Sequence, residues 1–207
     1  MIIGGFFMQK KNRFTLKRIA IDAVLMAVFF VLSRLSVTIS GIKITFDALA
    51  VILAAMIYGP IDAFIVGFLG EFLAQLLGPY GLTVTTLLWV LPPALRGVYV
   101  GLGSILLKKY MSLDVIMRTK RPYVYYAVCI LAAVLTSLGN TGAYYVDSKL
   151  FGYYSYALIF GVLGLRILSG ILSAILTATI ALPVLVALRH AKLIQAPVQP
   201  ATYTKEA

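Results

Sequence analysis

The chain has 207 residues, of which 61% are hydrophobic and only 12% are charged, and its mean hydropathy is +0.98. Soluble domains carry about 25% charged residues, so this composition excludes an ordinary soluble protein and indicates a surface that faces lipid. The formal net charge is +11, but the basic residues gather at the ends of apolar segments, which favours contact with membrane lipid over nucleic-acid binding.

Six apolar segments follow one another along the chain, and each is a predicted transmembrane helix. They cover approximately residues 16–35, 46–58, 61–77, 83–107, 123–145 and 154–188. The second is short and ends at Gly59-Pro60, a turn signal. The sixth exceeds one bilayer crossing, so we expect it to tilt or protrude. The pattern predicts an all-α integral membrane protein, a bundle of six transmembrane helices.

Lysine and arginine set the predicted orientation of this bundle. One side carries most of them: Lys10, Lys11, Arg13, Lys17, Arg18, Lys108, Lys109, Arg118, Lys120, Arg121, Arg189 and Lys192. The opposite side carries Arg34, Lys43 and Lys149. The positive-inside rule then places both termini in the cytoplasm.

The chain divides into three predicted parts. Residues 1–13 form a cytoplasmic N-terminal segment, residues 14–192 form the membrane domain, and the polar residues 193–207 form a disordered cytoplasmic tail. The single cysteine, Cys129, lies in an apolar run. It predicts neither an intramolecular disulfide nor a cysteine metal site.

Polar and ionisable side chains inside a membrane are costly and mark functional positions. At a helical rise of about 1.5 Å per residue, those of this chain gather in the outer half of the predicted bundle. The predicted substrate-binding residues are Lys43, Asp47, Glu71, Gln75, Trp89, Arg96, Asn140, Tyr144 and Arg166. Because a channel needs polar lining along its whole length, this one-sided distribution predicts a pocket that opens outward.

Some of the charged residues also have a structural explanation. Glu71 and Arg96 can form a buried ion pair between the third and fourth segments, which is compatible with a pocket beside it. Nearer the cytoplasm, Asp22 is placed to pair with Arg18 four residues earlier. We expect Asp62 to be an interfacial charge.

Small residues and prolines mark two of the segments. Ala20, Ala23 and Ala27 lie on the first, where Ala23-xxx-Ala27 is a pattern that lets another helix approach closely. Packing within the bundle is the alternative explanation. In the fourth segment, Pro92-Pro93 is expected to break the hydrogen-bond ladder, which a membrane protein tolerates where the break lines a cavity.

Together these features resemble the substrate-binding S component of an energy-coupling factor (ECF) transporter, in the group that binds folate, pantothenate and related vitamins. The resemblance covers residues 14–192. It rests on the six-segment layout and on these runs: Ala23-xxx-Ala27, Lys43-Ile44-Thr45-Phe46-Asp47, Tyr58-Gly59-Pro60, Gly67, Gly70-Glu71 and Gly78-Pro79-Tyr80-Gly81-Leu82-Thr83.

The resemblance implies a vitamin importer subunit in the bacterial plasma membrane, without enzymatic activity, cofactor or metal. The vitamin is expected to bind near the outer face, under the loops after helices one, three and five. Ala20, Ala23 and Ala27 then become docking residues for a membrane coupling protein that works with two ATPase subunits, and toppling in the membrane delivers the vitamin. The chain itself has no GxxxxGK[ST] nucleotide-binding motif.

The sequence leaves the substrate open. Lys43, Arg96 and Arg166 favour a carboxylate-bearing vitamin of the folate or pantothenate type, although Tyr80-Gly81-Leu82-Thr83-Val84-Thr85 departs from the Phe-Pro-Gly-Phe-Thr-Leu-like pattern of folate binders. The two acidic candidates can instead meet the ring nitrogens of pyridoxine or a thiamine precursor. An autonomous secondary carrier of a small organic solute is another alternative, against which the lack of an inverted repeat counts.

Overall fold

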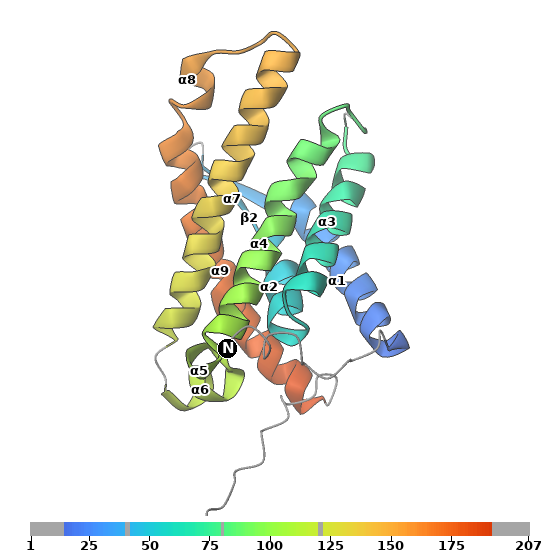
Figure 1. The fold of residues 1–207 in the computed structure, drawn as a ribbon, viewed down its shortest axis with the longest axis vertical. Coiled ribbons are helices and arrows are strands. Elements are labelled where there is room, and N and C mark those ends of the chain that lie inside the picture. The colour runs from blue at the N-terminus through green and yellow to red at the C-terminus, as the bar shows by residue number, and fades with distance from the viewer. Residues whose placement is uncertain (1–14, 40–41, 80, 120–121, 192–207) are drawn as a thin grey trace, which may run out of the picture.

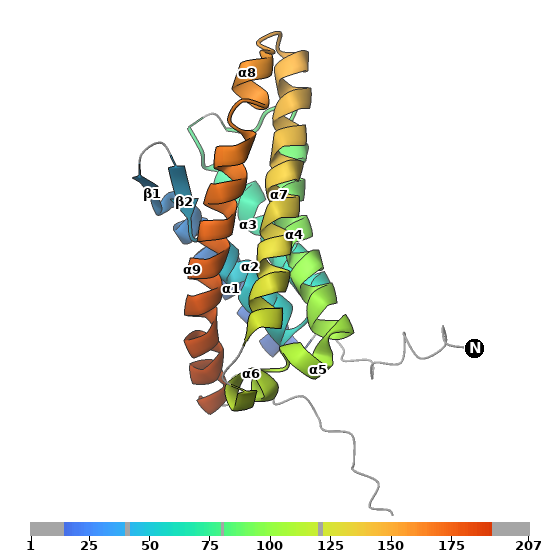
Figure 2. The same ribbon diagram turned by 90° about the vertical axis from the view of Figure 1, so that its left-hand side faces the viewer.

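The chain folds into a bundle of long helices with a small pair of strands at its side (Figure 1, Figure 2). This computed structural model describes residues 15–39, 42–79, 81–119 and 122–191. The elements are α1 (Leu16–Arg34), β1 (Ser36–Ile39), β2 (Ile42–Thr45), α2 (Ala48–Ile57), α3 (Pro60–Leu76), α4 (Thr86–Leu106), α5 (Lys108–Met111), α6 (Leu113–Thr119), α7 (Tyr123–Leu150), α8 (Tyr156–Ile159) and α9 (Leu163–His190). The predicted segments 1–13 and 193–207 lie outside the described residues.

The six predicted apolar segments correspond to α1, α2, α3, α4, α7 and α9. The structure differs from the prediction in two places near the predicted outer side, the sixth segment and the loop after α1. The sixth is not one continuous helix, because a turn over residues 160–162 separates α8 from α9. Gly161, a poor helix former, lies in this turn. The loop after α1 contains an antiparallel hairpin in which Val37 pairs with Ile44, and α9 packs against its second strand.

Length and composition show the protein's membrane character directly. Within the described ranges, three helical runs are long and apolar enough to cross a membrane: Thr86–Leu106, Tyr123–Leu150 and Tyr156–His190. Helix α1 is long enough, with 19 residues, but carries more charge, and helix α3 is shorter, with 17 residues. The chain is therefore an integral membrane protein, while the count of six spans and the cytoplasmic location of the termini stay predictions.

Helix α2 is the buried centre of the bundle. With 10 residues it is about 15 Å long, half the thickness of a hydrocarbon core of about 30 Å. Its buried members are Ala48, Ala50, Val51, Ile52, Leu53, Ala54 and Ala55. A helix that is apolar all round needs neighbours on every side, and α1, α3, α4 and α9 supply them.

Close backbone contact joins α3 to α4. A Cβ at Gly97 would lie 2.6 Å from the backbone of Ala63, and one at Gly101 would lie 2.5 Å from that of Pro60. These two glycines, four residues apart, therefore set the distance between the helices. The expected interruption at Pro92-Pro93 does not end α4, which stays helical through both buried prolines.

Ion pairs tie the helices together near the end of the bundle that carries α5 and α6. Arg18 pairs with the fully buried Asp62, through an Nε–Oδ1 distance of 2.7 Å and a second contact. The predicted pairing of Arg18 with Asp22 is thus wrong, because Asp62 reaches the guanidinium from the neighbouring helix α3. Arg189 bonds Asp114 on α6 at 2.5 Å.

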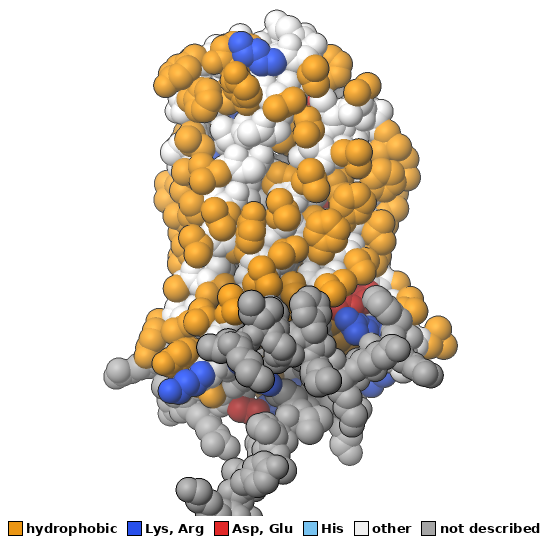
Figure 3. Space-filling view, in the orientation of Figure 1, with side chains coloured by type: hydrophobic (Ala, Val, Ile, Leu, Met, Phe, Trp, Pro, Cys, Tyr) orange, Lys and Arg blue, Asp and Glu red, His pale blue; other side chains and the backbone are white. Residues whose placement is uncertain are grey.

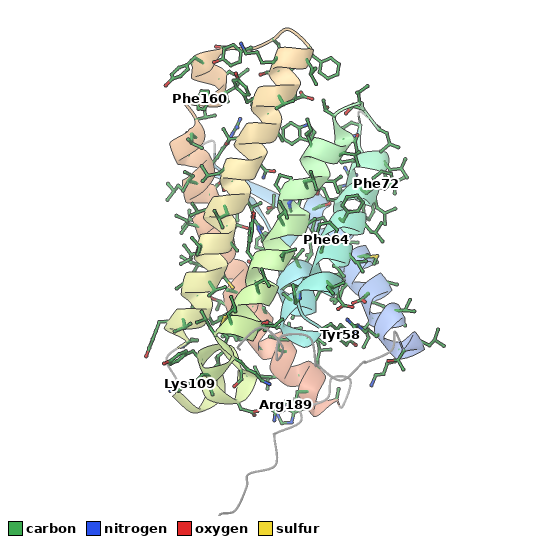
Figure 4. All side chains as sticks on the ribbon, in the orientation of Figure 1. Tyr58, Phe64, Phe72, Lys109, Phe160 and Arg189 are labelled. Carbon is green, nitrogen blue, oxygen red and sulfur yellow. The ribbon has the colours of Figure 1, made fainter. Side chains whose placement is uncertain are left out.

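On the face shown in Figure 3, the visible charged side chains lie mainly near the two ends of the molecule. On the same face, hydrophobic side chains cover most of the middle of the bundle. Figure 4 shows Lys109 and Arg189 at one end and Phe160 near the other. This distribution fits a protein whose middle is in contact with lipid.

Candidate functional site

A polar cavity of about 180 Å³ lies between α4, α7, α9 and the end of β2. Its wall consists of Thr45, Arg96, Ser137, Asn140, Arg166, Ser169, Gly170 and Ser173. Arg166 is in the first turn of α9 and Asn140 is in the second half of α7. The cavity therefore lies in the half of the bundle near α8, away from α5 and α6 (Figure 1).

Small residues bring α7 and α9 close together around this cavity. A Cβ at Gly170 would lie 2.6 Å from Oγ of Ser137 and 3.6 Å from the carbonyl oxygen of Ala133, so the two helices approach closely at these small residues. The Ser173 hydroxyl donates a hydrogen bond to the carbonyl oxygen of Thr45. That bond fastens the end of β2 to α9 and closes one side of the cavity.

Arg96 reaches the cavity from the middle of α4. Its Nε donates to Oγ1 of Thr136 at 3.3 Å, and the Thr136 hydroxyl donates to the carbonyl of Ala132 at 2.7 Å. This pair of bonds orients the guanidinium. Its terminal amino groups have no hydrogen-bond partner in the part of the chain that the structure describes.

Arg166 is held by an aromatic ring. The centre of its guanidinium is 4.7 Å from the ring centroid of Tyr144, a cation–π contact. Tyr144 in turn packs against Trp89 and Tyr153, with centroid distances of 5.9 and 6.0 Å. These three aromatic residues, the aromatic cluster, connect the cavity to the end of the bundle.

Asp147, near the end of α7, holds the aromatic cluster in place by accepting hydrogen bonds. The hydroxyls of Thr85 and Tyr153 both donate to the Asp147 carboxylate. The bond to Asp147 raises the pKa of Tyr153 to about 12. The bond from Thr85 ties the start of α4 to the end of α7.

The charge of the cavity wall is one-sided. The ion pairs among the described residues are those of Arg18 and Arg189, so neither Arg96 nor Arg166 has a described carboxylate partner. Asp47 attracts Arg96 electrostatically without contacting it as an ion pair. Two cations with no direct counter-ion inside a bundle are costly.

The structure places three predicted site residues together, because Arg96, Asn140 and Arg166 all line the cavity. Trp89 and Tyr144 belong to the adjacent aromatic cluster. These five residues come from α4, α7 and α9, helices that are far apart in the sequence.

The other predicted site residues lie elsewhere. Gln75 donates to Glu71 along α3 at 2.8 Å, and neither residue lines the cavity. Glu71 and Arg96 do not form the ion pair that the sequence allows. Asp47 occupies the N-cap position of α2 without capping it, and the Lys43 side chain lies outside the described part of the chain.

Sequence reasoning missed the small hydroxyl residues of the wall, Ser137, Ser169 and Ser173. A signal was present, because Ser169 and Ser173 are four residues apart in an otherwise apolar stretch and so share one face of α9. Thr45 contributes from the end of the unpredicted hairpin.

The fold and cavity define an integral membrane helical bundle with a positively charged polar cavity in one of its halves. The sequence model of a family described as "ECF transporter, substrate-specific component" matches residues 17–185. The chain belongs to this family, which consists of substrate-binding transporter subunits rather than enzymes.

One curated relative also matches the chain. It is described as a UPF0397 protein of Aliivibrio salmonicida (strain LFI1238), and it is 31% identical over 105 residues. The match covers 50% of this chain and 54% of that protein. The chain thus spans about half the length of the curated relative that it matches.

Proposed function

We propose that this chain is the substrate-binding subunit of an ECF importer, and that it captures a B-group vitamin of the folate or pantothenate type at the outer face of the bacterial plasma membrane. ATP-driven uptake then depends on partner subunits, a membrane coupling protein and two ATPases. Family membership supports the transporter role, and the polar cavity supports the capture of a small molecule.

The two arginines of the cavity carry the argument for a carboxylate ligand. Arg96 and Arg166 line the cavity without a described carboxylate partner, whereas the acidic candidates Asp47 and Glu71 are absent from its wall. A bound carboxylate would supply the missing counter-charge.

One observation favours a second candidate substrate. Oδ1 of Asp47 is buried and has no hydrogen-bond partner among the described residues. A protonated ring nitrogen or a hydroxyl of pyridoxine or of a thiamine precursor would donate a hydrogen bond to this oxygen. We rank this candidate second, because Arg96 and Arg166 would then remain without a counter-ion.

The surface of α1 supports docking onto the coupling protein. Ala20, Ala23 and Ala27 are all exposed on this helix. Their neighbours Ile19 and Val24 are also exposed, by 50% and 62%. This strip of small and aliphatic side chains would let a partner helix approach closely within the membrane.

Uptake by reconstituted vesicles tests the proposal. We expect vesicles that contain this chain alone to accumulate no vitamin. Vesicles that also contain the coupling protein and both ATPases should accumulate it when ATP is supplied, and an ATPase variant that cannot hydrolyse ATP is the matched control. Sustained uptake by the chain alone would instead show an autonomous secondary carrier.

A further inference from the structure

We infer that Arg96 and Arg166 together hold the ligand by a single oxyanion inside the polar cavity, and that the site selects compact acids, of the size of pantothenate rather than folate. This inference rests on the proposed function, because it takes the cavity to be the substrate site. It adds which atoms bind, which end of the ligand enters, and which ligands are excluded.

The first step concerns the free donors of the two arginines. The Nε of Arg96 is used by Thr136, which leaves its two terminal amino groups for a ligand. The guanidinium of Arg166 lies over the ring of Tyr144, with its central carbon 4.7 Å from the ring centroid. None of its N–H groups donates a hydrogen bond to another described residue, so they are available to an oxyanion.

The second step concerns the rest of the wall. The Ser169 hydroxyl donates to the carbonyl of Arg166 at 2.9 Å, and that of Ser173 donates to Thr45. These hydroxyls are therefore already committed as donors. The Asn140 amide has no hydrogen-bond partner among the described residues, so it is available to a second polar group of the ligand.

The third step concerns size and shape. At about 180 Å³, the cavity is smaller than the roughly 300–1,000 Å³ of sites for drug-sized ligands. None of its lining residues is aromatic or aliphatic. The wall therefore offers no aromatic stacking partner to a large ring system such as that of folate, whereas a compact acid with hydroxyl or amide groups would match it.

Matched ligand pairs test the inference on the purified wild-type protein. Pantothenate and pantothenol differ in a carboxylate and a hydroxymethyl group, and pyridoxal 5′-phosphate and pyridoxal differ in a phosphate. We expect the charged member of at least one pair to bind about 100-fold or more tightly than its neutral partner. The pair that responds shows whether the oxyanion is a carboxylate or a phosphate. Folate should bind more weakly than the compact acid.

Arginine variants test which residues hold the charge. Arg96→Gln and Arg166→Gln should each weaken binding of the charged probe by about 100-fold. Arg166→Lys, which keeps the charge but loses the fork of donors, should bind with intermediate affinity. Arg189→Gln is the matched control, since it removes a charge from α9 far from the cavity, and it should bind normally.

The outcomes separate this inference from the proposed function. Equal binding of charged and neutral partners, preference for folate, or normal binding by both glutamine variants would overturn the inference. Failure of every acid to bind the wild-type protein would overturn it as well. If the acid binds as expected but the complete transporter does not take it up, the proposed function is wrong and the anion site stands.

Discussion

The lack of a described counter-ion distinguishes Arg96 and Arg166, which line the cavity, from Arg18 and Arg189. Arg18 neutralises the buried Asp62, and Arg189 pairs with Asp114 at the end of α9. Arg96 has only the Thr136 hydroxyl as a described hydrogen-bond partner. Burying such a charge lowers the stability of the ligand-free protein, which is expected of a binding residue but not of a structural one.

The same substitution at two arginines tests this difference. We expect Arg96→Met to leave the free energy of unfolding of the ligand-free protein unchanged or to raise it by about 1 kcal/mol, because it removes a buried charge. Arg18→Met should instead cost about 3–5 kcal/mol, because it leaves Asp62 buried and unpaired. Thermal unfolding in detergent measures both. A large loss of stability in Arg96→Met would make Arg96 a structural residue.

The arginines and Asn140 of the cavity could be predicted from the sequence, because charged and amide groups stand out against the apolar residues of a membrane segment. Ser137, Ser169 and Ser173 were missed, since serine is common in membrane helices as a packing residue and the four-residue spacing of Ser169 and Ser173 is a weak signal. Glu71 shows a limit of the same reasoning. The helical rise gives its depth along α3, but depth does not tell which face of the helix meets the cavity.

Helix α1 has two surfaces with different roles. One side carries Phe29, which is fully buried and lies against Gly70 of α3. The other side exposes Ala20, Ala23 and Ala27. Changes on the exposed strip should therefore affect a partner without disturbing the cavity, which α1 does not line.

Tryptophan substitutions test the docking role of α1. Replacing both Ala23→Trp and Ala27→Trp should leave vitamin affinity within about twofold and abolish ATP-driven uptake, because bulky rings prevent close helix approach. Ala127→Trp, at an exposed position of α7, is the matched control and should transport normally. Equal effects on binding and transport would show that the strip belongs to the fold rather than to an interface.

Long apolar runs predicted α4 and α7 well, because a segment that crosses the membrane must form a helix to satisfy its own backbone hydrogen bonds. The hairpin was missed, although Val37-Thr38-Ile39 and Ile42-Lys43-Ile44 carry the β-branched residues typical of strands. Helix α2 shows a limit of hydropathy, since a short apolar run is compatible with both a span and a buried core helix.

The whole molecule is asymmetric along its long axis. The end with α5 and α6 carries the lysines Lys108 and Lys109 and the ion pair of Arg189. The other half contains the polar cavity and, beyond it, the aromatic cluster of Trp89, Tyr144 and Tyr153. This arrangement fits a subunit that binds its ligand near the outer face and leaves the energy-supplying steps to partners, with the orientation following from the positive-inside rule.

Ligand-dependent thermal stability of the purified chain, without any partner, tests the central claim most directly. The panel is folate, pantothenate, pyridoxine, thiamine, riboflavin and hydroxymethylpyrimidine, with Trp89 fluorescence as a second signal. We predict that one carboxylate vitamin alone stabilises the protein, by about 2.7 kcal/mol at 100 times its Kd. A folded protein that none of the six vitamins stabilises would contradict the claim that this chain captures a vitamin by itself.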